Sequence, residues 1–477
     1  MARIEGGTDK QEERLPAHII ASFGSVGLPL AAFLIVFGVY LPRYFVALGL
    51  PFATVGGAIA MVRLLDIGVD PIIGYFMDQT RTSMGRYRPW LLAATPVLMI
   101  GIFMLTMPQA SISMSYLMLW LLVSYAGFSV LMLGSAAWGA VLALSYHERS
   151  RLYGLTQSMA VLGTVLLLLL PAFTHGVVVP GKVASMPVIG WIMIVSIPVV
   201  VALCLAVVPE RIAPAKERPR FRLADYRAAV FRPSMARIAI SNILISLGAA
   251  ATGPIYIYFF KDVKGFTIAD TSFLLIFYVG AGFFGAPFWG RLARRFGKHQ
   301  ALQAACVAYA ISQAILMILP RVWPGHTLAA ALPTAAAMFA VGFASSSFLL
   351  LMRAMVADVV DEVRLATGQD LTSQLYAVVT TIEKTGAAIA VAIIFPILQL
   401  AGYDGRENAV NTPHAIFALQ MCYLFAPIVL VLVGATVFFG YRLDSKRHDE
   451  IRLALEERDT AAALEAISGP LPEAAQV

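Results

Sequence analysis

Charged residues are scarce in this sequence: Asp, Glu, Lys and Arg together make up 13% of its 477 residues. Typical soluble domains carry about 25% charged residues, whereas here 59% of residues are hydrophobic and the mean hydropathy is +0.78. Water therefore cannot be the main solvent of the folded chain. Lipid is the alternative, and it admits only helices and closed barrels, because every backbone N–H and C=O needs an internal partner.

Segments of alternating polarity, about ten residues each, would mark barrel strands, and this sequence lacks them. It has continuous apolar runs of about 20 residues or more instead, which are long enough to cross a bilayer as helices. The runs lie near residues 17–42, 51–77, 90–108, 113–145, 153–174, 186–208, 237–260, 267–290, 299–319, 328–356, 371–400 and 413–441. We therefore predict an all-α membrane protein with about twelve transmembrane helices.

Catalytic and metal-binding motifs are also missing. No GxSxG nucleophile elbow, HExxH pair or Walker loop occurs, and His and Cys do not cluster. The cysteines Cys204, Cys306 and Cys422 lie far apart inside apolar runs, without the spacing of a disulfide framework or a metal site. We predict that the protein is not an enzyme and binds no metal or cofactor.

Basic residues give the chain a net charge of +7 and concentrate in alternate loops between the apolar runs. The loops after the second, fourth, eighth and tenth runs carry Arg81, Arg86, Arg88, Arg149, Arg151, Arg291, Arg294, Arg295, Lys298 and Arg364. Because basic loops favour the cytoplasmic side, we predict cytoplasmic N- and C-termini in a bacterial-type inner membrane. Orientation in the lipid bilayer explains the charge, so we expect no nucleic-acid partner.

Residues 209–236 form the longest polar interruption and divide the apolar runs into two sets of six. We predict a cytoplasmic segment at 1–16, helical bundles at 17–208 and 237–441, a cytoplasmic loop between the bundles, and a cytoplasmic tail at 442–477. The loop after the second run, GYFMDQTRTSMGRYRPW, has an echo after the eighth, GAPFWGRLARRFGKHQ. Duplicated halves with a binding site between them are the usual architecture of secondary transporters.

Three charged residues lie inside the second apolar run. Arg63, Asp66 and Asp70 are spaced so that one face of a helix carries all three. Asp66 lies roughly 18 Å along the helix from Asp78, at 1.5 Å per residue, which is close to the bilayer midplane. Arg63 could neutralise one aspartate and pin two helices together, but the second carboxylate would remain unexplained. We hypothesise that Asp66 and Asp70 bind a coupling cation.

The eleventh apolar run carries Glu383 and Lys384 about half-way along, among small residues. One interpretation is a local or interhelical ion pair. The other places Lys384 opposite Asp66 and Asp70, as a charge whose partner changes when a cation or solute enters. We favour the second interpretation, with Glu383 as a further charge near the site.

The loop after the second run combines an acidic residue, glycines and several arginines. Simple orientation by basic residues would explain the arginines alone. The added aspartate and the glycine spacing favour an ion-paired cytoplasmic latch, which holds one access state and breaks in the other. The predicted latch residues are Gly74, Asp78, Arg81, Gly85, Arg86 and Arg88.

The longer stretch RLLDIGVDPIIGYFMDQTRTSMGRYRPWLL resembles the glycoside–pentoside–hexuronide:cation symporters of the major facilitator superfamily. The segment VADVVDEVRLATGQ and Lys384 also stand where that family has them. The resemblance implies a major facilitator fold of two six-helix halves. It also implies that Asp66 and Asp70 are the paired cation-site aspartates, Arg63 their neighbouring arginine and Lys384 the lysine near that site.

Departures from the family pattern affect both substrate and cation. Pro29 and Gly134 stand where melibiose permease-like members have the aspartates that clasp a galactoside. Val69 and Leu131 stand where such members have an Asn and a hydroxyl residue that help to hold sodium. Fewer neutral oxygens suit a proton better than Na⁺, so we expect H⁺ coupling, with Na⁺ as the alternative.

These observations predict a secondary active transporter that moves a small solute, such as a sugar or glycoside, in symport with a cation by alternating access. A carrier of lysolipids or other amphipathic solutes is the alternative, and a sensor built on a transport fold is a more distant one. Trp138, Tyr376 and Thr380 are candidate residues of the substrate cavity. We expect the protein to function as a monomer.

Overall fold

The computed structural model describes residues 15–108, 112–142, 146–173, 185–210, 231–321, 328–368, 371–406, 409–441, 443 and 445–467. Within these ranges the chain is helical and has no strand, apart from one isolated bridge between Thr82 and Gly85. Most of the predicted N-terminal segment (1–16) and of the predicted central loop (209–236) lies outside the described residues.

Twelve helical stretches of the described chain are long and apolar enough to cross a membrane, which confirms the predicted architecture. In the first half they are α1 (Ala17–Gly24) with α2 (Gly27–Ile35), η1 (Val36–Tyr40) and α3 (Leu41–Ala47), then α4 (Phe52–Gln79), α5 (Arg88–Thr106), α6 (Met114–Leu142), α7 (Tyr146–Phe173) and α8 (Ser185–Val207). In the second half they are α10 (Pro233–Tyr258) with η2 (Phe259–Val263), α11 (Ile268–Phe296), α12 (Lys298–Ile318), α13 (Leu328–Thr367), α14 (Thr372–Leu400), and α15 (Pro413–Gln420) with η3 (Met421–Phe425) and α16 (Ala426–Thr436).

The first, seventh and twelfth spans each contain a π-helical turn, η1, η2 and η3. Such turns locally widen a helix and occur often at functional sites. The first span also packs closely on α7 through glycines. A Cβ at Gly27 would lie 2.3 Å from the backbone oxygen of Thr156, and one at Gly163 would lie 2.3 Å from the backbone oxygen of Leu28. Small residues of this kind let two membrane helices approach each other.

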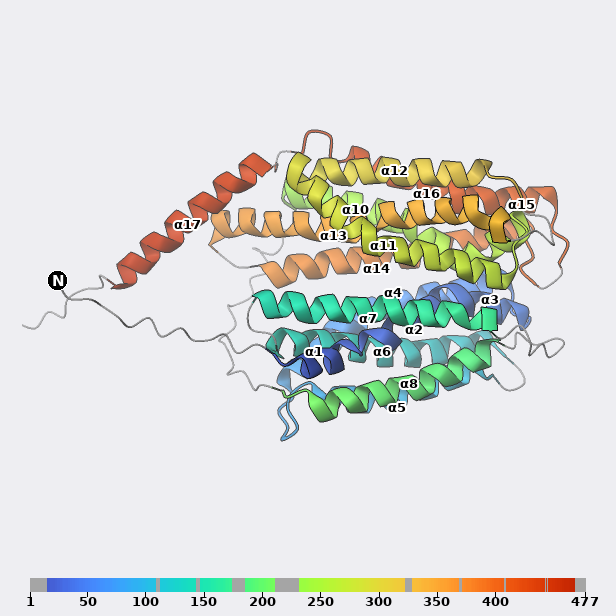
Figure 1. Cartoon of the computed structure of the whole chain (residues 1–477), viewed down its shortest axis with the longest axis horizontal. Coiled ribbons are helices and arrows are strands. Elements are labelled where there is room, and N and C mark those ends of the chain that lie inside the picture. The colour runs from blue at the N-terminus through green and yellow to red at the C-terminus, as the bar shows by residue number, and fades with distance from the viewer. Residues whose placement is uncertain are drawn as a thin grey trace, which may run out of the picture.

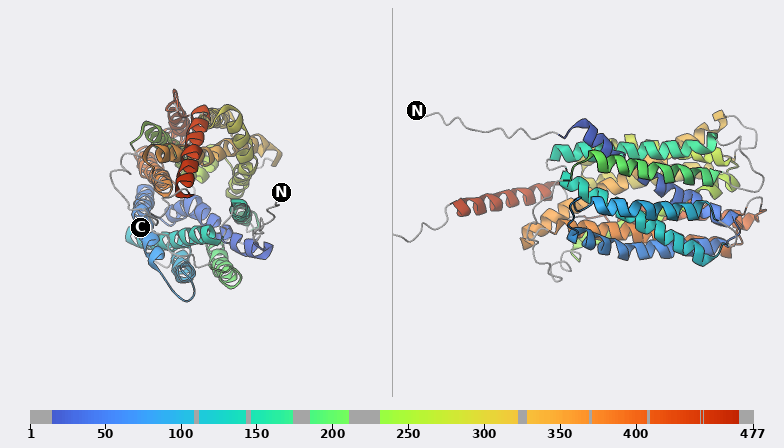
Figure 2. Two further views of the ribbon diagram at one scale, coloured as in Figure 1. Left: turned by 90° about the vertical axis from the view of Figure 1, so that its left-hand side faces the viewer. Right: turned by 90° about the horizontal axis from the view of Figure 1, so that it is seen from below.

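The helices form two groups that lie side by side, α1–α8 and α10–α16 (Figure 1). Contacts between the groups join α4 to α14, α7 to α11, and α10 to η1 and α3. A further helix, α17 (Ser445–Ile467), extends from one end of the bundle and packs against α13 (Figures 1 and 2). We call this end the α17 end, and the opposite end, which carries α3 and α15, the α3 end.

Side chains from the two groups close tightly at the α3 end. Phe52 of α4 stacks on Phe395 of α14 with ring centroids 4.3 Å apart. The backbone N–H of Ala53 donates to Gln399 Oε1 at 2.8 Å. A Cβ on Gly56 would lie only 2.3 Å from Phe395 Cβ, so there is no room for a side chain at Gly56. The absence of a side chain lets α4 approach α14 closely. The two halves therefore close against each other at this end through α4 and α14, a contact that we call the seal of the α3 end.

A buried tyrosine adds a polar contact to the same seal. Tyr403 donates its hydroxyl hydrogen to the carboxylate of Asp262, and its ring packs edge-on against Phe52 at 5.6 Å. Burial and the neighbouring Asp262 charge raise the pKa of Tyr403 well above its usual value. Tyr403 therefore remains a proton donor to Asp262 at any physiological pH.

Candidate functional site

Helix α4 places the three predicted intramembrane charges on adjoining turns. The Asp66 side chain is only 8% exposed and that of Asp70 is 19% exposed. Pro71 follows Asp70 inside the helix and has no N–H. The backbone oxygen of Ile67, four residues earlier, consequently has no helical donor. The site thus combines two carboxylates with a backbone oxygen left free of the helical ladder.

Lys384 of α14 lies between the two carboxylates, as the second interpretation of the eleventh run predicted. Its ammonium donates to Asp66 Oδ2 at 2.8 Å and also contacts Asp70 Oδ2 directly. Helices α4 and α14 come from different halves of the chain. One cation shared by two carboxylates leaves the cluster with one negative charge in excess when all three groups are ionised, and this cluster sits on the contact between the halves.

Ser129 is a member of the cluster that the sequence did not reveal. It lies on α6, is 3% exposed, and donates its hydroxyl hydrogen to Asp66 Oδ1 at 2.7 Å. The sequence comparison placed the corresponding position at Leu131, two residues away, and positions so spaced do not share a helix face. The sequence offered little to single it out, because Ser129 is one of several serines in that apolar run.

One carboxylate oxygen in the cluster has no partner. Asp70 Oδ1 is buried and accepts no hydrogen bond from any described residue. Leaving a buried acceptor unsatisfied costs about 1–3 kcal/mol, and more when the group is charged. A proton or a metal cation bound to this atom would remove that cost and would also neutralise the excess negative charge. Asp70 Oδ1 is therefore the open position of the cluster.

Arg63 is not the partner of either aspartate. Among the described residues it forms no ion pair within 4.0 Å, and its guanidinium approaches Gly38 in η1, where a Cβ would lie 3.9 Å from Nη2. Lys384, not Arg63, neutralises the carboxylates in this conformation. In this structure Arg63 therefore does not neutralise an aspartate, as the alternative interpretation required.

Glu383 precedes Lys384 and lies on a different face of α14. Its carboxylate is 3.9 Å from the guanidinium of Arg353 on α13 and lines a cavity of about 380 Å³. Helices α10, α11, α13 and α14 surround this cavity. The polar residues that line it are Asn242, Ser246, Tyr278, Ser345, Ser346 and Glu383.

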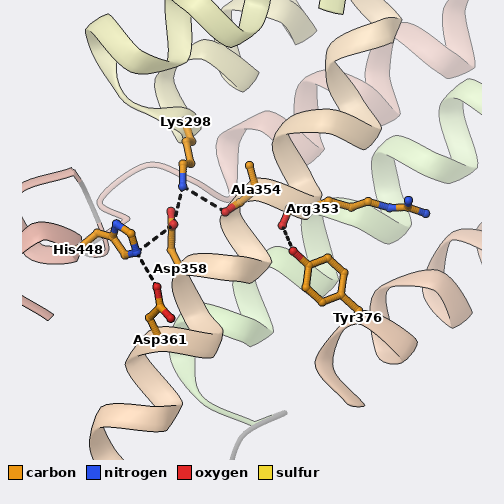
Figure 3. Close-up of polar contacts among 7 residues, drawn as sticks. All are labelled: Lys298, Arg353, Ala354, Asp358, Asp361, Tyr376 and His448. Carbon is orange, nitrogen blue, oxygen red and sulfur yellow. Dashed lines mark hydrogen bonds and ion pairs between the residues drawn. The ribbon is translucent and has the colours of Figure 1, made fainter. Parts of the chain in front are cut away.

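The three predicted cavity residues occupy other places. Trp138 is fully buried, packs edge-on against Phe23 at 5.9 Å and lies under the guanidinium of Arg88. Tyr376 donates its hydroxyl hydrogen to the backbone oxygen of Arg353 at 3.0 Å (Figure 3). Thr380 donates to the backbone oxygen of Tyr376 at 3.1 Å. None of the three lines the cavity beside Glu383.

A polar cluster at the α17 end attaches α17 to the second half (Figure 3). Lys298 contacts the carboxylate of Asp358 and donates to the backbone oxygen of Ala354 at 3.2 Å. His448 of α17 lies 3.3 Å from Asp358 and 3.0 Å from Asp361 through Nε2. Arg353 extends away from this cluster in Figure 3, so it is available to Glu383.

The predicted latch loop is organised by Glu210, another residue that the sequence did not reveal. Its carboxylate accepts the backbone N–H groups of Arg86, Tyr87 and Arg88 at 2.5, 3.0 and 3.3 Å. Arg86 donates to the backbone oxygen of Met77 at 3.1 Å, and Arg88 to that of Leu205. The loop is thus tied to the end of α8 within its own half.

The other predicted latch residues make no such link. Gly74 has nothing within 4 Å of an added Cβ, and the exposed Arg81 forms no ion pair with any described residue. The side chain of Asp78 lies outside the described part of the structure. The role of this loop as a latch between access states stays a prediction.

Replacing Gly85 by alanine is expected to detach Glu210 from the loop. Gly85 has a φ of +111°, which L-residues rarely adopt, and an added Cβ would lie 2.2 Å from Glu210 Oε2. We expect a stability loss of about 1–3 kcal/mol, measured as a lower Tm of the purified protein in detergent. Gly74→Ala is the matched control and should change Tm little. Equal Tm values for both variants would contradict this description of the loop.

Comparison with known proteins is consistent with this geometry. The chain matches the family described as MFS/sugar transport protein over residues 22–445. The isoprimeverose transporter of Lactiplantibacillus pentosus is 27% identical over 420 residues, with 83% of this chain and 82% of that protein covered. A sphingosine-1-phosphate transporter of Mus musculus is 24% identical over 474 residues, with 91% and 92% covered. These relatives are transporters and not enzymes.

A solved structure shows the same fold. The nucleoside transporter NupG superposes with a TM-score of 0.68 at 11% sequence identity, covering 88% of this chain and 99% of that one. At this identity the likeness concerns the fold alone. The described helices therefore have the arrangement of a known membrane transporter.

Proposed function

Because the chain belongs to the MFS/sugar transport protein family, we propose that this membrane transporter couples the movement of a small solute to that of a cation by alternating access. The observation that carries the proposal is the cluster of Asp66, Asp70 and Lys384 at the contact between α4 and α14. A buried charge in excess, with one open carboxylate oxygen, is the arrangement that a coupling cation completes.

Cation binding would change the attraction between the halves. In the described state Lys384 bridges both aspartates across the contact. Once Asp70 takes up a cation, its hold on Lys384 weakens, while Asp66 keeps both Lys384 and the hydroxyl of Ser129. Weakening one link between α4 and α14 lowers the cost of separating them, which alternating access requires.

A proton is the cation that this cluster suits best. Asp66 Oδ1 already accepts from Ser129, and both Oδ2 atoms already face Lys384. Na⁺ would need about six oxygen ligands by analogy with other hard cations, whereas a proton needs only Asp70 Oδ1. The hydroxyl of Ser129 supplies one neutral oxygen that the sequence did not reveal. Sodium coupling is therefore the alternative outcome of the test.

The solute that we propose is a sugar or glycoside. The similarity to an isoprimeverose transporter supports it, and so do the polar side chains that stand within the mainly apolar lining of the cavity beside Glu383. The similarity to a sphingosine-1-phosphate transporter favours a second candidate, an amphipathic lipid. Uptake of labelled sugars, glycosides, uronates and lysolipids by a transport-deficient host separates them. Accumulation of a neutral sugar supports the proposal, and accumulation of lipids alone overturns it.

The distribution of basic loops also indicates how the protein is oriented in the membrane. We propose that the α17 end is cytoplasmic, in a bacterial-type inner membrane, because basic loops lie at that end. The sealed α3 end would then face outward, and the described conformation would be closed to the outside. We also propose that one chain is the functional unit, since the site is built entirely from the two halves of a single chain.

A further inference from the structure

We propose that Glu383 binds the solute and selects a neutral polyhydroxylated molecule of mono- or disaccharide size. This inference rests on the proposed function of sugar transport and adds the residue and the selectivity that would carry it. The proposed role of Glu383 is independent of the coupling cluster, because Glu383 contacts neither Asp66 nor Asp70.

The geometry separates the roles of two consecutive residues. Neighbouring side chains on a helix point about 100° apart. Lys384 reaches the carboxylates of α4, whereas Glu383 lines an open cavity together with residues of α10, α11 and α13. A solute held by Glu383 would therefore sit one residue away from the coupling lysine on the same helix.

The lining of the cavity matches the hydrogen-bonding pattern of a sugar. Ser346 donates its hydroxyl hydrogen to the backbone oxygen of Phe343 at 2.8 Å, and Ser345 donates at 3.2 Å either to the backbone oxygen of Gly342 or to the hydroxyl of Tyr278. Their lone pairs are left to accept from solute hydroxyls. The hydroxyl of Tyr278 has a hydrogen to donate, and Asn242, which donates to the backbone oxygen of Val379 and accepts from Ser246, has a second N–H and a second lone pair. Ile245 and Phe348 supply an apolar wall for the C–H face of a sugar ring.

The carboxylate of Glu383 is the strongest acceptor in the cavity. Hydroxyl groups that donate to an ionised carboxylate form bonds roughly twice as strong as neutral ones, and sugar hydroxyls would donate to it alongside the side chain of Asn242, which also hydrogen-bonds to this carboxylate. Arg353 lies 3.9 Å away with a side chain that is 48% exposed, so it balances the charge without occupying the carboxylate. This arrangement favours a neutral polyol.

The same features disfavour other solutes. A uronate would bring a second carboxylate next to Glu383 at membrane depth, where like charges repel strongly. A quaternary ammonium headgroup would be attracted by the carboxylate, but it would have no hydrogens to donate to Glu383 or to the serine oxygens. A cavity of about 380 Å³ is near the lower limit for small-molecule sites, which suits a mono- or disaccharide rather than a long acyl chain.

Equilibrium binding to the purified full-length protein, without any ion gradient, tests the inference. The probes are methyl β-D-xylopyranoside, methyl α-D-glucopyranoside, D-glucuronic acid and lysophosphatidylcholine. Wild-type protein is expected to bind at least one neutral glycoside and to bind glucuronic acid at least about tenfold more weakly. Glu383→Gln should weaken binding of that glycoside by about tenfold or more, while Glu362→Gln, a matched change on α13 outside the cavity, should not.

A second variant keeps the test decisive if Glu383→Gln does not fold. Ala249→Leu adds only apolar atoms to the wall of the same cavity and is expected to reduce glycoside binding as strongly. Unchanged glycoside binding in the folded Glu383 variant or in Ala249→Leu, or binding of the uronate or the lysolipid only, would overturn the inference. Glycoside binding that depends on Glu383 but drives no cation movement would uphold the role of Glu383 and refute the proposed cation coupling. The failure of one proposal can therefore be distinguished from the failure of the other.

Discussion

Replacing Asp70 by asparagine is expected to abolish concentrative uptake while exchange of solute down its gradient persists. Asp70 Oδ1 is the open carboxylate oxygen of the cluster, and an amide at that position can neither take up a proton at neutral pH nor supply the negative charge that a coupling cation would balance. Lys384 would keep its bond to Asp66 at 2.8 Å, so the halves would still meet. Disturbing a buried ion pair costs about 3–5 kcal/mol, and we expect the accumulation ratio to fall to that of passive equilibration.

Asp66→Asn provides a second form of the same experiment. It removes the carboxylate that holds both Lys384 and the hydroxyl of Ser129. We expect it to lose accumulation as well. Asp270→Asn is the control, because Asp270 lies in the capping box at the start of α11 and is not part of the cluster. Labelled-solute accumulation in intact cells is the measurement, and wild-type accumulation in both Asp66 and Asp70 variants would sink the cation-site assignment.

Replacing Gly56 by leucine is expected to abolish transport by holding the α3 end open. A Cβ at this position would lie 2.3 Å from Phe395, so α4 and α14 cannot close as they do here. The ring of Phe52 would also lose its stacked contact with Phe395. Because closure at this end is one of the two states of the cycle, a protein that cannot reach it cannot complete transport.

Thiol labelling measures this change of state directly. In an Ala53→Cys background, the membrane-impermeant reagent should label the Gly56→Leu protein from outside much faster than the parent. The three native cysteines are buried and should contribute little background. Gly57→Leu is the matched control, since a Cβ there meets nothing within 4 Å. Equal labelling of the two leucine variants would mean that the contact at Gly56 does not control closure.

Much of this architecture could be predicted from local patterns in the sequence. The twelve spans were predictable because each is a long apolar run in a chain with few charges. The shared face of Asp66 and Asp70 followed from helical periodicity alone. Lys384 was placed opposite them because it lies half-way along an apolar run and stands where the resembling family has a lysine near its cation site, and the structure brings these three residues together.

Contacts between distant helices could not be predicted in the same way. Ser129 and Glu210 are ordinary residues in the sequence, and only packing brings one to Asp66 and the other to the N–H groups of Arg86–Arg88. Trp138 looked suitable for a cavity because it is aromatic, but its side chain is fully buried beneath Arg88. Periodicity assigns a residue to a helix face, whereas the neighbour of that face depends on the tertiary fold.

The most direct test of the account is proton movement driven by solute in proteoliposomes that contain the purified protein and a trapped pH dye. Addition of an accepted solute at constant Na⁺, with no membrane potential imposed, is predicted to acidify the lumen in the wild type and not in Asp70→Asn. Replacing Na⁺ by choline should leave the signal unchanged. Solute uptake that needs millimolar Na⁺ and moves no protons would contradict the proposed role of Asp70 as a proton site.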